Sequence, residues 1–328
     1  MSRNKPLVSV LISVYNAGEY LRPSLQSILD QTYPNLEIII IDDGSTDGCI
    51  GSIEEIKDPR VRILTQKNNG KATALNRGLD VLSGVFYATH DADDISHPDR
   101  IKHQVQCMLE NPQIAAVFIG YDLILNGRHV APRFQGKDVE QCRQDIEQFM
   151  MPSNDPTGMY RMSMVRNIRY EPTLRIGQGF DYILRVGEIY PMMLLGECLY
   201  SYRVHFASTT RRNSDLRKQM IQRVLTRACQ RRGVEFTNHF QSESKLASRF
   251  VHREYETCIV PHFMKSVLDL RLAGQRWESL KTAFTCLHLH PFDPYYYKPL
   301  CYFLTPMKLI RYYRSRKAKA RDIWNLGD

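Results

Sequence analysis

The sequence has no apolar run close to the ~20 residues that a membrane-spanning helix requires. Its first residues, Met1–Pro6, carry no signal-peptide pattern and lead directly into an apolar, strand-like segment. The 8 cysteines are scattered, without a CxxC pair or a metal-ligand spacing. This pattern indicates neither a zinc centre nor a disulfide framework, and it predicts a cytoplasmic protein with reduced thiols.

Composition is that of an ordinary globular protein, with 43% hydrophobic and 24% charged residues among 328. The net charge of +9 is concentrated near the C-terminus, where no acidic residue separates a run of basic ones: Arg311, Arg314, Arg316, Lys317, Lys319 and Arg321. The tail carries no nucleic-acid recognition motif and no interleaved aromatic platform, so we expect no nucleic-acid partner.

Strand-like and helix-like segments alternate in the first third of the chain. Leu7–Val14, Glu37–Ile41 and Val85–Thr89 are apolar and rich in β-branched residues, and helical periodicity separates them. This alternation predicts an α/β fold with a doubly wound, mostly parallel sheet over residues 1–210. Residues 211–328 are predicted to form a C-terminal helical region that ends in the basic tail.

Acidic residues crowd the end of one predicted strand. Asp91, Asp93 and Asp94 follow the apolar run Val85–Ala88 within four positions of His90. Carboxylates packed this closely repel one another unless a cation lies among them. Oxygen-rich sites of this kind suit Mg²⁺ or Mn²⁺, which often bridge to substrate phosphates.

The same acids also have a structural interpretation. Asp94 or Ser96 could cap the helix that Pro98 opens. At the level of the sequence both hypotheses remain open.

Two further loops at predicted strand ends carry candidate binding groups. Asp43 can accept from a base N–H, and Tyr15 offers an aromatic face; the alternative for the Asp42–Ser45 segment is a capped turn. Lys71 follows Gly70 at a helix start, so its ammonium and the helix dipole could act together on a phosphate, unless it is an ordinary surface lysine.

Five segments in this order resemble glycosyltransferase family 2, the inverting nucleotide-sugar transferases of GT-A fold: residues 8–16, 41–47, 69–78, 90–94 and 202–205. The resemblance covers roughly residues 6–210. It implies a metal-dependent enzyme that moves a sugar from a nucleotide-sugar to a glycan or lipid-linked acceptor in cell-surface polysaccharide synthesis. A UDP-sugar is favoured because Asp43 can accept from a uracil-type N–H.

The resemblance also implies roles for individual residues. It assigns the nucleotide-sugar to Ser13, Tyr15, Asp42, Asp43, Lys71, Asp91 and Arg203. It assigns a divalent metal, Mn²⁺ or Mg²⁺, to Asp93 and His205.

The match fails at the catalytic base. The family carries a Glu-Asp pair there, whereas this chain has Gln178 and Gly179, neither of which takes a proton at neutral pH. The first hypothesis is that Asp181 acts as a displaced base. The second is that the acceptor supplies its own ionisable group or that Asp155 or Glu171 approaches. The resemblance places residues 154–161 in the acceptor-side loop. The third is a catalytically impaired nucleotide-sugar-binding protein.

The C-terminal segment Leu300–Tyr313 mixes aromatic and basic residues, with Tyr295–Tyr297 upstream. Such a segment can lie on an anionic membrane surface, which would make the protein peripheral at the inner face of the membrane. Pro306 interrupts any clean apolar face, and the alternative is a packed terminal helix with a solvated basic end.

Overall fold

The structure is a computed structural model. It describes residues 5–125, 128–130, 135–204, 214–236, 260, 263–264, 267–268, 270–271, 274, 276–289, 291–306 and 308–309. Two compact units divide the chain, Met1–Glu243 and Ser244–Asp328. The first unit ends later than the boundary at residue 210 that the sequence suggested, because helix α8 (Ser214–Arg232) packs on it through ion pairs such as Arg231 with Glu188.

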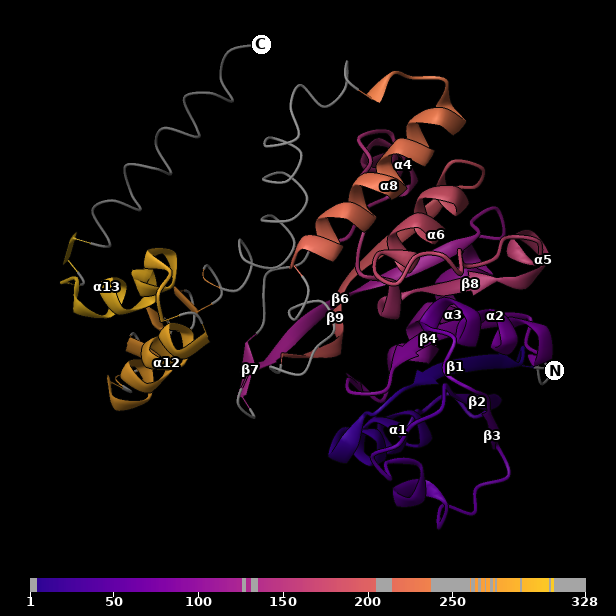
Figure 1. The fold of residues 1–328 in the computed structure, drawn as a ribbon, viewed down its shortest axis with the longest axis horizontal. Coiled ribbons are helices and arrows are strands. Elements are labelled where there is room, and N and C mark those ends of the chain that lie inside the picture. The colour runs from indigo at the N-terminus through magenta and orange to yellow at the C-terminus, as the bar shows by residue number, and fades with distance from the viewer. Residues whose placement is uncertain are drawn as a thin grey trace. The chain divides into compact units, whose positions relative to one another are not determined.

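A nine-stranded sheet forms the first unit, in the order β3-β2-β1-β4-β8-β6-β9-β5, with β7 paired to β6 (Figure 1). The strands are β1 Val8–Val14, β2 Leu36–Asp42, β3 Val61–Thr65, β4 Phe86–Asp91, β5 Ile95–Ser96, β6 Ala116–Leu125, β7 Arg128–Val130, β8 Met159–Arg161 and β9 Met192–Val204. The first four strands of the order are mutually parallel, as the alternating pattern predicts. β6 and β9 also run parallel, whereas β8 and β5 are antiparallel to their neighbours.

Register places three polar strand ends side by side. Val14 pairs with Asp42 across β1 and β2, and Ser13 pairs with Asp91 across β1 and β4. Ligands of open α/β sheets bind beyond the carboxyl ends of the strands. The sheet therefore gathers the predicted binding residues at one edge.

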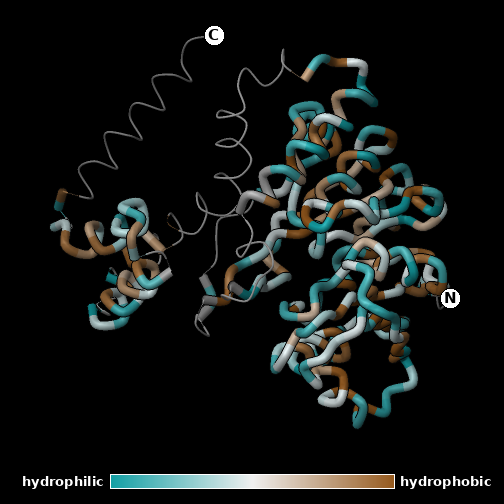
Figure 2. Tube along the Cα trace, in the orientation of Figure 1, coloured by the Kyte–Doolittle hydropathy of each residue, from teal (hydrophilic) through white to brown (hydrophobic). Residues whose placement is uncertain are grey.

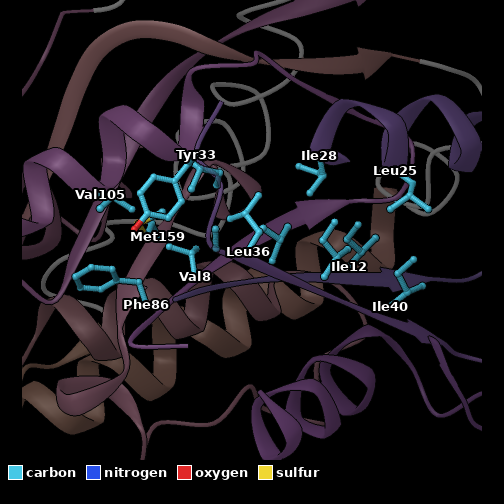
Figure 3. Packing of buried hydrophobic residues seen from close by; sticks show 14 of the residues in the cluster. Val8, Ile12, Leu25, Ile28, Tyr33, Leu36, Ile40, Phe86, Val105 and Met159 are labelled. Carbon is cyan, nitrogen blue, oxygen red and sulfur yellow. The ribbon is translucent and has the colours of Figure 1, made fainter. Parts of the chain in front are cut away.

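One face of the sheet is covered by α1 (Leu21–Leu29) and α3 (Arg100–Glu110). Alternate residues of β1 point to this face, where they pack with α1 and α3 into one buried cluster (Figure 3). Teal and brown alternate along these helices, as expected for helices with one buried side (Figure 2).

The opposite face carries α2 (Lys71–Val81) and α6 (Gln178–Gly187). A glycine allows α2 to approach β1, because a Cβ atom on Gly78 would lie 2.1 Å from Cδ1 of Leu11. The Tyr87 hydroxyl of β4 donates to that of Tyr182 on α6 at 2.7 Å, so β4 and α6 are joined across this face.

The remaining elements are short helices in the first unit and the helices of the second. They are η1 Gly18–Tyr20, η2 Ile50–Ile53, α4 Val139–Glu147, η3 Asp155–Thr157, α5 Met162–Val165, α12 Arg276–Leu289, η5 Pro294–Tyr297 and α13 Lys298–Leu304. Across the described ranges, none of the helices combines the length and the apolar character needed to cross a bilayer.

Replacing Gly78 with alanine should destabilise the first unit. The added methyl meets Leu11, which is fully buried, at 2.1 Å. Overpacking costs up to about 3 kcal/mol, and the better helix propensity of alanine offsets about 1 kcal/mol. We expect the free energy of unfolding in urea to fall by about 2 kcal/mol. Gly51→Ala is the control, because no atom lies within 4 Å of its added Cβ; equal effects of both substitutions would contradict the packing argument.

Candidate active site

The acidic loop after β4 forms a compact group of carboxylates. Oxygen atoms of Asp91, Asp93 and Asp94 lie within 4.8 Å of one another. Three hard oxygen donors at this spacing match the preference of Mg²⁺ and Mn²⁺. The residues present therefore fit the divalent metal that the sequence implied, with Asp91 and Asp93 at the partly exposed side of the group.

Asp94 instead faces the protein interior and anchors strand β9. It is fully buried; its Oδ2 accepts from the Tyr200 hydroxyl at 2.7 Å, and its Oδ1 accepts from the Arg203 amide at 2.8 Å. Burial, together with the charges of Asp93 and Asp91, raises the pKa of Asp94 well above its usual value. The alternative of a helix cap by Asp94 is wrong, because its oxygens bind β9.

Ser96 does not cap a helix either. Helix α3 begins after Asp99, and the Ser96 hydroxyl accepts from Arg100 Nη1 at 3.0 Å. His90, the first residue of the acidic motif, is also structural: it is buried and bonds Ser24 at 2.9 Å and Ser96 at 3.2 Å.

Arg203 holds the acidic loop from the other side. Its Nε donates to the Asp93 carbonyl at 2.8 Å, and its guanidinium lies 4.9 Å from the Tyr20 ring centre. The structure therefore places Arg203 beside the group of three carboxylates. His205, the second predicted metal ligand, lies outside the described residues.

Asp43 orders the loop that precedes Lys71. The carboxylate is almost fully buried; Oδ1 accepts from the Asn69 amide and Gln66 Nε2, and Oδ2 accepts from the Gly70 amide at 2.8 Å. Gly70 precedes α2 with a φ of 91°, which favours glycine. Asp43 thus fixes the start of α2. The sequence predicted a contact between Asp43 and a nucleotide base and did not predict this structural role.

Lys71 is the cation that faces the acidic loop. Its Nζ lies 2.5 Å from Asp91 Oδ1. Burial lowers the pKa of Lys71, but the charges of Asp91 and Asp155 oppose this and leave the pKa raised overall. The side chain therefore stays charged at the N-terminus of α2, where both ammonium and helix dipole favour an anion.

The remaining predicted nucleotide residues lie on the same edge of the sheet. Ser13 is half-buried in β1, and Tyr15 beyond it is 53% exposed, which leaves its ring accessible to a base. Asp42 Oδ1 accepts from the Ser45 amide at 2.9 Å, so this carboxylate also shapes its own turn.

Asp155 adds a carboxylate to this edge. It opens η3, and its Oδ1 lies 3.4 Å from the Tyr160 hydroxyl and 3.5 Å from the Tyr170 hydroxyl. Burial raises the pKa of Asp155 to about 6, although the charge of Lys71 acts in the opposite direction. Stacked and edge-on rings surround it in a tyrosine cluster: Tyr87, Tyr160, Tyr170 and Tyr182.

Asp181 does not have the surroundings of a displaced base. It is buried, with Oδ2 accepting from Arg185 Nε at 2.8 Å and Oδ1 lying 3.7 Å from Arg231 Nη1. Residues two positions apart on a helix are separated by about 200°, so Asp181 and Gly179 face different neighbours. The structure thus argues against the role that the sequence assigned to Asp181, because Arg185 of α6 and Arg231 of α8 occupy its carboxylate.

Comparison with known proteins identifies the family. Residues 9–168 match the family described as Glycosyl transferase family 2. An uncharacterized glycosyltransferase from Haemophilus influenzae is 34% identical over 226 residues, or 63% of this chain and 68% of that protein. The chain belongs to glycosyltransferase family 2. It is accordingly an enzyme that transfers a sugar.

Further relatives of this glycosyltransferase agree with that assignment. The putative teichuronic acid biosynthesis glycosyltransferase TuaG from Bacillus subtilis is 37% identical over 127 residues, 38% of this chain and 50% of TuaG. The chain thus spans half of TuaG and about two thirds of the Haemophilus protein.

Solved structures confirm the GT-A type fold. Staphylococcus aureus TarS 1-349, in complex with UDP-GlcNAc, aligns with a TM-score of 0.56 at 16% identity, covering 79% of this chain and 80% of that one. The mannosyltransferase PcManGT from Pyrobaculum calidifontis, in complex with GDP-Man and Mn²⁺, aligns with a TM-score of 0.56 at 16% identity, covering 92% and 86%.

Removing the Asp94 carboxylate should destabilise the glycosyltransferase. Asp94→Ala leaves the Tyr200 hydroxyl and the Arg203 amide without their acceptor, at about 1–3 kcal/mol for each donor, while relief of repulsion from Asp91 and Asp93 offsets part of this. We expect a net loss of about 1–3 kcal/mol in urea unfolding with a metal chelator present.

The matched control is Asp80→Ala, which removes a carboxylate that is 61% exposed and pairs with Arg169. Exposed pairs contribute about 0–1 kcal/mol. Equal losses for the two variants would show that Asp94 does not anchor β9.

Proposed function

We propose that this glycosyltransferase moves a sugar from a nucleotide-sugar, with a UDP-sugar favoured, to a glycan or lipid-linked acceptor of cell-surface polysaccharide. The observation that carries the proposal is the group Asp91, Asp93 and Asp94 beside the charged Lys71, at the carboxyl edge of a parallel sheet. This arrangement combines a hard-metal site with an ammonium and a helix N-terminus, which is the chemistry that a diphosphate requires.

Each part has a defined task in such a transfer. Asp93 is proposed to hold Mn²⁺ or Mg²⁺, and Asp91, which the resemblance assigned to the nucleotide-sugar, lies close enough to share that ion. The ion would act as a Lewis acid on the leaving nucleoside diphosphate. Lys71 adds a second positive charge, and Arg203 fixes the loop through the Asp93 carbonyl. Asp43 and Tyr15 are proposed to contact the base, with Ser13 and Asp42 completing that pocket.

Related proteins support a nucleotide-sugar as the donor and polysaccharide synthesis as the process. The aligned TarS structure binds UDP-GlcNAc, and the aligned PcManGT structure binds GDP-Man with Mn²⁺. TuaG is named for teichuronic acid biosynthesis. We therefore favour UDP-sugars and include GDP-mannose among the donors to be tested.

The second candidate is a nucleotide-sugar-binding protein with impaired catalysis, which Gly179 at the usual base position favours. Both candidates predict donor binding, but only the first predicts turnover. Release of nucleoside diphosphate from a panel of donors separates them.

Donor binding should depend on the acidic loop. We expect UDP and UDP-GlcNAc to raise the melting temperature with Mn²⁺ and to lose most of this effect with a chelator, because a ligand that binds only the folded state stabilises it by about 2.7 kcal/mol at 100 times its Kd. Asp93→Asn should abolish the metal-dependent part. Glu110→Gln, at an exposed position on α3, should retain it; a metal-independent shift of equal size in all variants would count against the metal site.

We also propose that the second unit contacts an anionic membrane surface. Several large apolar side chains there are exposed, including Phe292 at 98% and Leu304 at 70%, and the basic tail follows in the sequence. Apolar insertion and attraction of basic residues to anionic lipid add together in peripheral binding.

Vesicle co-sedimentation checks the membrane proposal. We expect the full chain to pellet with vesicles of phosphatidylglycerol and phosphatidylcholine, and Phe292→Ser/Leu304→Ser to pellet several-fold less. Ile189→Ser, which alters a 62% exposed residue of the first unit, is the control. Equal pelleting of all three proteins, or none by the native chain, would refute membrane contact through this surface.

A further inference from the structure

We propose that Asp155 accepts the proton of the acceptor hydroxyl, from the space that a side chain at position 179 would otherwise fill. This inference rests on the proposed transfer from a nucleotide-sugar. It assigns the base to the loop that opens η3 rather than to helix α6.

Asp155 occupies the space that a side chain at position 179 would need. A Cβ atom on Gly179 would lie 2.5 Å from Cβ and Cγ of Asp155 and 2.6 Å from its Oδ2. These distances are far below a van der Waals contact, so a carboxylate at position 179 and Asp155 in its present place exclude each other. The chain carries one carboxylate at this point, and it comes from residue 155.

Strand β4, which ends at Asp91, holds Asp155 in this position. The Thr89 hydroxyl donates to the Asp155 carbonyl at 2.6 Å, and Thr89 lies two residues before Asp91 in β4. The tyrosine hydroxyls of residues 160 and 170 lie on the Oδ1 side, whereas Oδ2 is directed toward Gly179. Its side chain is therefore oriented into the space beside α6.

The other two carboxylates considered for this role are occupied. Asp181 is paired with Arg185 and Arg231. Glu171 pairs with Arg227 at 3.0 Å and accepts from the Thr173 hydroxyl at 2.7 Å. Asp181 and Glu171 are therefore each engaged by an arginine of α8 and by a neighbour in the chain. Asp155 is the carboxylate that lies beside Gly179.

The protonation behaviour of Asp155 agrees with the geometry. A pKa raised to about 6 leaves the group ionised at pH 7, yet makes it a stronger base than an ordinary aspartate. Lys71 stabilises the ionised form and links Asp155 electrostatically to Asp91.

The step balances without a further reactant. The acceptor oxygen forms a bond to the anomeric carbon with inversion, while its proton passes to an Asp155 carboxylate oxygen. The bond between the anomeric carbon and the phosphate oxygen breaks, and the nucleoside diphosphate leaves with the electron pair. Release of the proton to solvent restores Asp155.

Asp155→Asn tests the assignment directly. We expect release of nucleoside diphosphate, measured with water and with simple methyl glycosides as acceptors, to fall 10²–10⁴-fold, the usual contribution of a general base. The affinity for UDP with Mn²⁺ should change less than about threefold, because Asp155 is not among the metal ligands proposed. Full activity in Asp155→Asn would overturn the inference, as would loss of activity in Asp181→Asn with Asp155→Asn unaffected.

A reciprocal exchange separates a base from a merely structural residue. Asp155→Gly removes the Cβ atom that blocks position 179, so Asp155→Gly/Gly179→Asp returns one carboxylate to the same space from α6. We expect the double variant to be at least tenfold more active than Asp155→Gly, and Gly179→Asp alone to lose stability through the clash. Melting curves of all variants show which of them fold.

Failure of the inference differs from failure of the proposed function. If the native chain binds and turns over a donor but the double variant is no better than Asp155→Gly although folded, Asp155 is not the base and the function stands. If the native chain neither binds nor turns over any donor, the proposed function fails, and with it the base assignment.

Discussion

Repulsion among the carboxylates at the end of β4 and in the loop that follows is the constraint on which the site depends. Asp91, Asp93 and Asp94 lie close enough to share one cation, and Asp91 and Asp94 also have partners within the protein. Lys71 meets Asp91, and Asp94 is satisfied by Tyr200 and Arg203 from β9. Charges this close are tolerated only when they are paired or hydrogen-bonded. The sheet order places β9 beside β5, and β9 supplies the hydrogen-bond donors that Asp94 requires.

Another buried carboxylate, Asp43, is satisfied by hydrogen bonds from the loop before Lys71. Asp43 uses both oxygens to hold the amides of Asn69 and Gly70, and this fixes the first turn of α2. The Lys71 ammonium then contacts Asp91, which is paired in register with Ser13. A carboxylate thereby positions a cation, and the cation in turn balances a second carboxylate.

Much of this arrangement could be predicted from local sequence. The apolar run of β1 and the residues after β2 and β4 follow from alternation and strand ends, and Lys71 follows from the glycine before a helix. The roles of Asp94 and Tyr200 could not, because the hydrogen bond between them joins distant parts of the chain. Nothing local distinguishes a carboxylate that caps a helix from one that anchors a remote strand.

Sequence alone determined the family, the succession of strands and helices along the chain, and the candidate residues Asp91, Asp93 and Lys71, because these depend on short patterns with fixed spacing. Tertiary structure alone decided which carboxylate lies beside Gly179. Asp181 is two residues away in the chain, but its carboxylate is paired with Arg185 of α6 and Arg231 of α8, whereas Asp155 belongs to another loop and lies against Gly179. Packing between helix α6 and η3 settles this, and such contacts are set by the whole fold rather than by neighbouring residues.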